Sequence, residues 1–245
     1  MIKIKSITKR YGKKLALDQV SISLGQGVYG LLGPNGAGKS TLMNLLTLNL
    51  RAEQGEIFWE GRNILEMGRE YRKLLGYAPQ QQGFYDSFSG RRFLGYMACL
   101  KGIRKAEAAR EIDRVLDYVN MQEAADRAIG GYSGGMKQRI LIAQAILGNP
   151  RIIVLDEPTA GLDPKERIRI REKIAEIAEE RTVLLSTHVV SDVARIAKEI
   201  ILLKEGQIVS CDTVENLCTK YGVSELEEVY MHIFGGAADD ENTAF

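Results

Sequence analysis

The feature that most constrains this chain is the segment GPNGAGKST at residues 33–41. It matches G-x-x-x-x-G-K-[ST] and lies between the apolar run VYGLLG and leucines at helical spacing, the strand–loop–helix context that this pattern requires. The glycines let the backbone curl around a phosphate, and the N–H groups and the helix N-terminus direct positive charge towards it. We therefore predict a phosphate-binding loop made of Gly33, Pro34, Asn35, Gly36, Ala37, Gly38, Lys39, Ser40 and Thr41. Lys39 should reach the β- and γ-phosphates, and the Ser40 hydroxyl should hold Mg²⁺.

Two acidic residues end a second apolar run, RIIVLDEPT, at residues 151–159. Asp156 stands where a carboxylate can bind the water shell of Mg²⁺. Glu157 follows immediately, so its side chain points another way and can polarise an attacking water. The pair predicts hydrolysis at the phosphate site, with Asp156 at the metal and Glu157 as the base.

Composition excludes several classes of function. The net charge of +1 does not indicate a nucleic-acid partner. The three cysteines, Cys99, Cys211 and Cys218, form no C-x-x-C pair. We therefore expect neither a zinc site nor a disulfide framework. Neither a run of about 18 apolar residues nor an apolar block of signal-peptide length is present, so we expect a cytosolic chain.

Strand and helix patterns alternate along the chain and predict an α/β fold with a mostly parallel sheet. Strands or hairpins are expected in MIKIKSITKRYG, LDQVSISLGQG, VYGLLG, GEIFWEGRNI, LLGYAPQ, RIIVLDEP, TVLLSTH and IILLKEGQIVSC. Helices are expected in residues 87–147, PKERIRIREKIAEIAEE and SDVARIAKEI, and after a capping box at Ser224 and Glu227. The helical stretch interrupts the alternation and predicts an inserted all-helical subdomain.

One further segment, GYSGGMKQR at residues 131–139, places a serine and two glycines where a helix should begin, although glycine weakens helices. Taken with the other motifs, it resembles the nucleotide-binding subunit of ABC transporters over residues 11–234. Six motifs occur in order: GPNGAGKST resembles Walker A, YAPQ the Q-loop, YSGGMKQR the family signature, IIVLDEPT Walker B, GLD the D-loop and STH the switch histidine.

The resemblance implies a P-loop NTPase (RecA-like) core with a mostly parallel sheet, an antiparallel β subdomain and an inserted α-helical subdomain. The ABC ATPase domain would span residues 1–234. Its core would take residues 1–86 and 149–220, the helical subdomain 87–148 and a C-terminal helix 224–234. The tail at residues 235–245 is acidic and expected to be disordered.

The resemblance also implies a shared ATP site. In this family two subunits meet head to tail, and each ATP lies between one phosphate loop and the partner's signature. Ser133, Gly134 and Gly135 would then contact the partner's ATP, and Asp163 would cross the interface. A serine can cap a helix whose dipole faces an anion, and glycines allow close approach.

The remaining roles are carried over by motif. Tyr11 resembles the aromatic that stacks on adenine, and Gln80 the glutamine that senses Mg²⁺ and the attacking water. His188 resembles the switch histidine at the γ-phosphate; His232 receives no role. The signature departs from the commoner LSGGQ, since Met136 cannot hydrogen-bond as glutamine would, but its Ser-Gly-Gly core is intact.

The resemblance predicts an ATP hydrolase that powers transport, in the direction of export, through a separate membrane permease. The permease would dock near residues 84–93, from Phe84 to Phe93, on the inner face of the cell membrane. The second ATPase subunit could be identical or different. Two alternatives are a soluble ABC ATPase without a permease, as in iron–sulfur assembly, and a P-loop GTPase, although N-K-x-D is absent.

Overall fold

The core of the fold is a six-stranded sheet in the order β10-β9-β3-β8-β7-β6. The computed structural model describes residues 1–80 and 83–235. Five strands of this sheet are parallel to one another: β3 (Gly27–Leu32), β6 (Leu75–Ala78), β7 (Ile152–Asp156), β8 (Thr182–Ser186) and β9 (Glu199–Lys204). Strand β10 (Gln207–Asp212) returns antiparallel to β9. The mostly parallel sheet expected from the sequence is therefore present.

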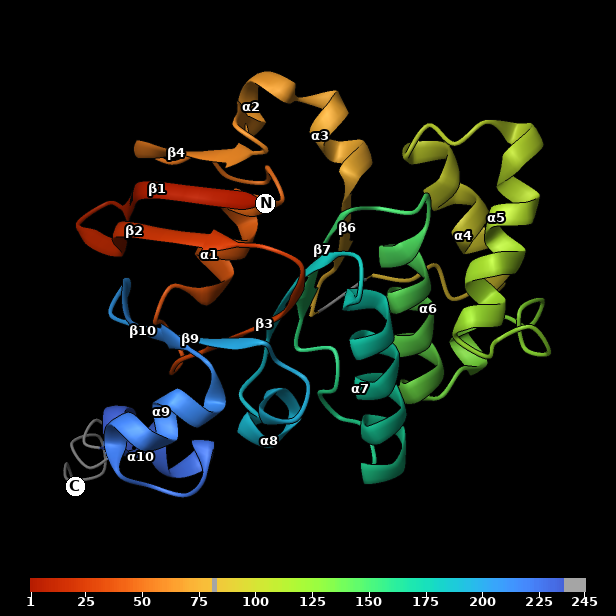
Figure 1. Ribbon diagram of the computed structural model, residues 1–245. Coiled ribbons are helices and arrows are strands. Elements are labelled where there is room, and N and C mark those ends of the chain that lie inside the picture. Colours follow the sequence, from red (N-terminus) through yellow and green to blue (C-terminus); the bar gives the residue numbers. More distant parts are fainter. Residues whose placement is uncertain (81–82, 236–245) are drawn as a thin grey trace, which may run out of the picture.

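A second, antiparallel sheet lies beside the first, in the order β2-β1-β4-β5 (Figure 1). Its strands are β1 (Ile2–Tyr11), β2 (Lys14–Leu24), β4 (Gln54–Trp59) and β5 (Arg62–Asn63). Helix α1 (Lys39–Leu46) lies between the two sheets and buries Leu42, Leu45 and Leu46. The short helices α2 (Ile64–Met67) and α3 (Arg69–Leu74) lead back to β6. These elements enclose one apolar core.

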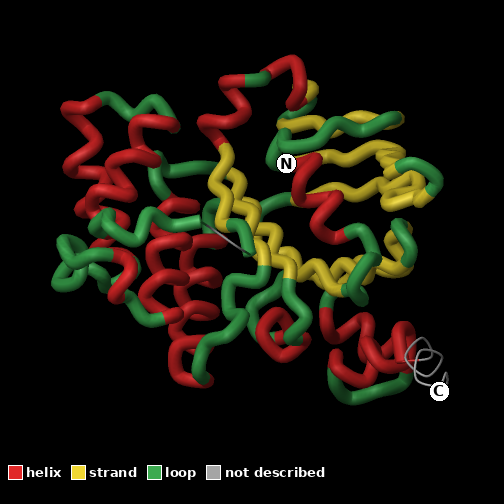
Figure 2. The backbone as a smooth tube through the Cα atoms, turned by 180° about the vertical axis from the view of Figure 1, so that it is seen from behind, coloured by secondary structure: helices red, strands yellow, loops and turns green. Residues whose placement is uncertain are grey.

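The opposite face of the six-stranded sheet is covered by helices, as the view from behind in Figure 2 shows. Helices α6 (Gly134–Ile146) and α7 (Pro164–Ala178) pack directly on the strands. Helices α4 (Gly90–Leu100) and α5 (Lys105–Tyr118) pack on α6, farther from the sheet, and a 3₁₀ turn lies at Ile129–Gly131. Helix α5 buries Ile112, Val115 and Leu116 at helical spacing. Strand β7 alternates between the two cores, since Ile153 faces this one and Val154 the other. Burial on both faces explains the continuous apolar run of that strand.

The C-terminal part corrects two expectations and contains one helix that was missed. Helix α8 covers only Val190–Ala194, because the chain must rejoin the sheet, where the Lys198 amide donates to Val28 O and β9 begins at Glu199. Helix α9 (Val214–Tyr221) was not predicted; Thr213 caps it and Gly222 ends it. The capping box at residues 224–227 is wrong, since α10 (Leu226–Phe234) begins after Glu225 without a side-chain cap. The hydroxyl of Ser224 instead donates to Glu228 Oε1 (3.2 Å).

The expected disordered tail, Gly235 apart, falls on residues 236–245, outside the described part of the chain. Among the residues that are described, no helix has the length and apolar character needed to cross a bilayer.

Candidate functional site

The loop between β3 and α1 is shaped by glycines. A Cβ at Gly33 would lie 2.2 Å from the carbonyl oxygen of Leu203, and one at Gly38 would lie 2.4 Å from that of Ala16. Gly38 also has a φ of 110°, a value that L side chains rarely adopt. Only glycine therefore fits at these two positions. The loop curls tightly, so that the first turn of α1 presents its free N–H groups to the space in front.

The Lys39 side chain lies inside this loop. Its Nζ donates to the carbonyl oxygens of Gly33 (2.6 Å) and Pro34 (3.1 Å). Burial lowers the pKa of Lys39, while the negative charges of Glu157 and Asp156 oppose that shift. The ammonium group is thus held close to two carboxylates from another part of the chain.

Adjacent strand ends bring those carboxylates to the loop. Asp156 pairs with Ser186 in the register of β7 and β8, and Ser186 Oγ donates to Asp156 Oδ1 (2.8 Å). Burial raises the pKa of Asp156, and the charge of Glu157 adds to this. The hydrogen bond from Ser186 and the charge of Lys39 act in the opposite direction.

Glu157 occupies a strained position at the start of the next turn. Its φ is 51°, a left-handed conformation that costs a non-glycine residue about 1–3 kcal/mol. Its amide donates to Ser186 O (2.9 Å), and its side chain is buried. Its Oε2 lies 2.8 Å from Nδ1 of His188, which is largely exposed. The geometry of that contact is not that of a hydrogen bond, so the buried Oε2 accepts none from the described residues.

A cleft of about 250 Å³ lies in front of the loop and the two carboxylates. It is lined by Tyr11, Lys14, Ala16, Pro34, Asn35, Gly36, Gly38, Lys39, Ser40, Thr41, Gln80, Asp156, Glu157 and Ser186. Gly33 and Ala37 are buried within the loop itself. The residues predicted for phosphate, metal and base thus come together from three separate parts of the sequence: the loop at 33–41, Gln80 and the pair Asp156–Glu157.

The chemistry of the cleft fits a nucleotide triphosphate with Mg²⁺. The glycine cradle leaves backbone N–H groups for phosphate oxygens. The half-buried carboxyl of Asp156 and the hydroxyl of Ser40 are oxygen ligands of the kind that Mg²⁺ prefers. The buried Oε2 of Glu157, which accepts no hydrogen bond within the described part of the chain, is an acceptor that a water molecule can satisfy.

Five other predicted site residues do not line this cleft: Ser133, Gly134, Gly135, Asp163 and His188, of which His188 contacts it only through Glu157. Ser133 caps α6, and its Oγ accepts from the amide of Met136 (3.2 Å). Asp163 caps α7, and its Oδ1 accepts from the amides of Lys165 (3.0 Å) and Glu166 (3.1 Å). Both caps are exposed at helix N-termini.

Two polar residues of the cleft were missed from the sequence, Lys14 and Ser186. Lys14 is the register partner of Tyr11 in the first hairpin, and a Cβ at Gly36 would lie 3.8 Å from its Nζ. Ser186 ends the apolar run TVLLS, as Asp156 ends RIIVLD. That position at the end of an apolar run was the sequence signal for Ser186, but its place beside Asp156 follows from the pairing of β7 with β8 in the structure.

Comparison with known proteins agrees with this geometry. Residues 17–160 match the family described as ABC transporter. The chain belongs to this family. YxlF of Bacillus subtilis, an uncharacterised ABC transporter ATP-binding protein, is 37% identical over 209 residues, which are 85% of this chain and 69% of YxlF. The daunorubicin resistance ATP-binding protein DrrA2 of Streptomyces coeruleorubidus is 33% identical over 230 residues, 93% of this chain and 71% of DrrA2.

Among solved structures, a dimeric bacterial ABC transporter cassette matches with a TM-score of 0.77 and 27% identity. The match covers 87% of this chain and 98% of the cassette. The same cassette is also known in a dimeric post-hydrolysis state bound to ADP and Pi. The P-loop NTPase fold expected from the sequence is confirmed, and this member of the ABC transporter family is an ATP hydrolase.

Proposed function

We propose that this ABC ATPase binds and hydrolyses MgATP in a head-to-tail dimer and so powers export through a separate membrane permease. The observation that carries the proposal is the division of the site. The cleft holds the phosphate loop, the two carboxylates and Gln80, whereas the signature and Asp163 lie outside it. A second subunit is therefore needed to bring all the motifs to one nucleotide.

The residues of the cleft have distinct roles in this proposal. Tyr11 stacks on the adenine ring, and the loop amides with Lys39 hold the phosphates. Ser40, Gln80 and Asp156 would hold Mg²⁺, which would neutralise charge on the phosphate oxygens. Glu157 accepts a proton from the attacking water, and His188, next to its Oε2, contacts the γ-phosphate.

The signature of the partner subunit completes the site. Ser133 directs its hydroxyl, and the N-terminus of α6 its amides, at the partner's γ-phosphate. A Cβ at Gly134 would meet nothing within 4 Å among the residues that the structure describes. Since the fold itself leaves room for a side chain there, close approach of a group from outside the chain explains the glycine.

The permease docks near residues 84–93 in this proposal. Tyr85 is exposed there, the Arg92 guanidinium lies 4.1 Å from the centre of the Phe88 ring, and Phe84 packs edge-on against Phe93. Exposed aromatic and arginine side chains are enriched at protein interfaces. The subunit would then lie on the inner face of the cell membrane. Export is proposed because the relative DrrA2 is named for drug resistance.

The mass of the Glu157→Gln variant in solution, with and without MgATP, tests the proposal. Loss of the base should stop turnover but leave ATP bound, so MgATP should convert the monomer into a stable dimer. The same variant with Ser133→Arg should bind ATP and stay monomeric. A dimer that forms equally well with Ser133→Arg would contradict the shared site.

A further inference from the structure

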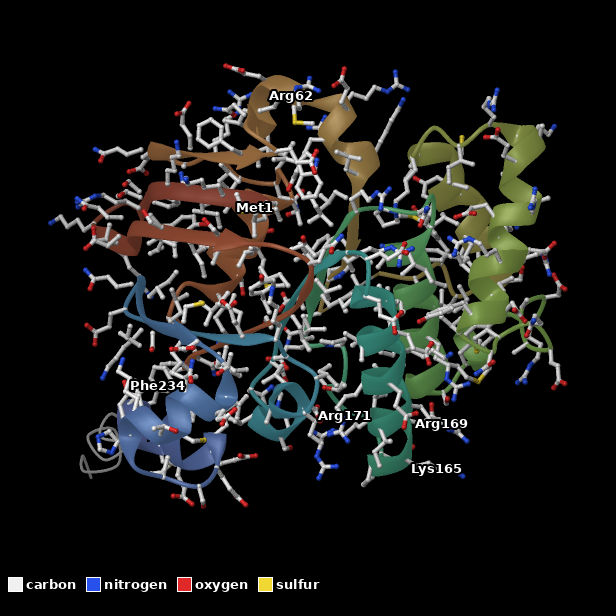
Figure 3. The ribbon with its side chains drawn as sticks, in the orientation of Figure 1. Met1, Arg62, Lys165, Arg169, Arg171 and Phe234 are labelled. Atoms are coloured by element: carbon white, nitrogen blue, oxygen red, sulfur yellow. The ribbon has the colours of Figure 1, made fainter. Side chains whose placement is uncertain are left out.

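A buried carboxylate outside the cleft joins three segments that meet behind it. Asp192, in α8, is 1% exposed. Its Oδ2 accepts from the Thr159 hydroxyl (2.6 Å) and from Nη2 of Arg167 (3.0 Å). Its Oδ1 accepts from Nη1 of Arg171 (3.0 Å). Figure 3 shows Arg171 on the side of α7 that faces α8.

Each partner of Asp192 belongs to an element that carries a site residue. Thr159, itself buried, stands two residues after Glu157, and the amide of Ala160 donates to Glu157 O (3.2 Å) to close that turn. Arg167 and Arg171 lie on α7, the helix that Asp163 caps. The carboxylate therefore ties the turn of Glu157 to α7.

Asp192 itself stands four residues after His188. The intervening turn is fixed locally, since the Val189 amide donates to Thr187 Oγ1 (3.0 Å) and the Asp192 amide to Val189 O (3.1 Å). This short, hydrogen-bonded connection means that a displacement of Asp192 moves the His188 backbone with it.

We propose that Asp192 is a positioning residue that holds His188 against Glu157, a proposal that rests on the hydrolytic roles given to those two residues above. The strained φ of Glu157 persists only if its surroundings fix the turn. The bond from Thr159 to Asp192 fixes one side of that turn, and α8 fixes His188 on the other. Two arginines neutralise the buried charge and hold the carboxylate in a single orientation.

The test compares Asp192→Asn with the wild-type chain in MgATP hydrolysis and MgATP binding. A small misplacement of catalytic groups lowers rates by up to about a hundredfold, so we expect kcat to fall roughly ten- to hundredfold. The affinity for MgATP should stay unchanged, because the phosphate loop lies on a different element. In a His188→Ala background Asp192→Asn should lower kcat by a smaller factor than in the wild-type chain, since only the bond to Thr159 at the Glu157 turn is then left to lose.

Thr159→Val is the milder second variant, since it removes one hydrogen bond and leaves the ion pairs intact. Glu111→Gln is the matched control: its carboxylate accepts from Arg114 and from the Gly148 amide, within the helical part of the chain. Thr159→Val should lower kcat less than Asp192→Asn, and Glu111→Gln should leave it unchanged. Equal kcat for the wild-type and Asp192→Asn chains would overturn the proposal.

NMR spectroscopy tests the position of His188 without measuring ATP hydrolysis. The chain has two histidines, so the ring signals of His188 can be followed by NMR with His232 as an internal reference. Asp192→Asn should shift the His188 signals and leave those of His232 in place; unchanged His188 signals would overturn the proposal. Hydrolysis by the wild-type chain and its loss in Glu157→Gln test the ATPase roles separately.

Discussion

Asp156 is half-buried at the end of β7, and this burial raises the pKa of its carboxyl group. A carboxyl group with a raised pKa in the folded state binds its proton more tightly there than in the unfolded chain. Ionisation therefore costs stability, and this cost grows as the pH rises from the ordinary value towards the raised one. At neutral pH the folded chain carries the full cost, which the metal-binding role proposed for Asp156 would explain.

We therefore predict that Asp156→Asn raises the stability of the chain without nucleotide while abolishing Mg²⁺-dependent hydrolysis. The amide oxygen can still accept from Ser186, and no charge remains to be desolvated. A gain of about 1 kcal/mol would raise the Tm by about 2–4 °C in a domain of this size. Thermal unfolding followed by circular dichroism at pH 7.5 measures this. The gain should shrink at acidic pH, where Asp156 is itself protonated; a lower Tm at pH 7.5 would contradict the prediction.

Residue types and local spacing predicted which side chains gather in the cleft, but not the contacts between them. The phosphate loop, Asp156 and Glu157 could be named because each follows an apolar strand. The contact of His188 with Glu157 and the bond from Ser186 to Asp156 depend on the pairing of β7 with β8. Strand order is a long-range property that spacing along one chain does not contain. Asp192 was missed for the same reason, because its partners lie at least 21 residues away.

At the scale of elements, the two signature glycines face different surroundings. A Cβ at Gly135 would lie 3.3 Å from Cγ and Oε2 of Glu166, whose carboxylate also pairs with Arg139 of α6. A Cβ at Gly134 would meet nothing within 4 Å in the described ranges, 1–80 and 83–235. The packing of α6 against α7 thus explains why Gly135 has no side chain. It does not explain the glycine at position 134.

Gly134→Ala should consequently stabilise the isolated chain and impair hydrolysis. Replacing a helical glycine that has room for a side chain gains about 0.4–1 kcal/mol. The added methyl group would oppose close approach of the partner's nucleotide, and we expect hydrolysis to fall roughly tenfold or more. Thermal unfolding and steady-state ATPase rates check both parts. A stabilised variant with the wild-type rate would mean that nothing approaches Gly134 closely.

Elements with a long apolar face were predictable, whereas the C-terminal ones were less so. Helix α5 has apolar residues at helical spacing over 14 residues, and strand β7 is a short apolar run bounded by turn residues. Helix α9 was missed although Val214, Leu217, Cys218 and Tyr221 have helical spacing, because its eight residues are short for that signal. Helix α8 was predicted too long, since Ile200 was read as the end of a helix but pairs with Gly30 in the sheet.

At the scale of the whole molecule, one sheet separates two apolar cores and brings the cleft to the carboxyl ends of its parallel strands. The signature lies on α6, which belongs to the core on the helical side. The chain therefore presents the cleft and the signature as separate surfaces. In a two-fold dimer the cleft of each subunit can meet the signature of its partner.

Mixing two inactive variants tests that arrangement. Lys39→Ala disables the cleft of its own chain, and Ser133→Ala disables the signature that the chain offers to its partner. Each variant alone should hydrolyse ATP at least roughly a hundredfold more slowly, the loss expected when a phosphate or oxyanion donor is removed. In a mixed dimer one site combines both defects and the other combines an intact cleft with an intact signature. An equimolar mixture should therefore recover about one quarter of the wild-type activity, because about half of the dimers are mixed.

The matched control is a mixture of Lys39→Ala with Glu157→Gln. Both changes fall in the cleft of the chain that carries them, so a mixed dimer has one defect in each site and no intact one. The ATPase rate of this mixture should stay as low as that of either variant alone. Recovery in the control would mean that Glu157 also acts across the interface. Absence of recovery in the first mixture would contradict the head-to-tail arrangement. If the signature acted on the cleft of its own chain, every chain in either mixture would carry a defective site.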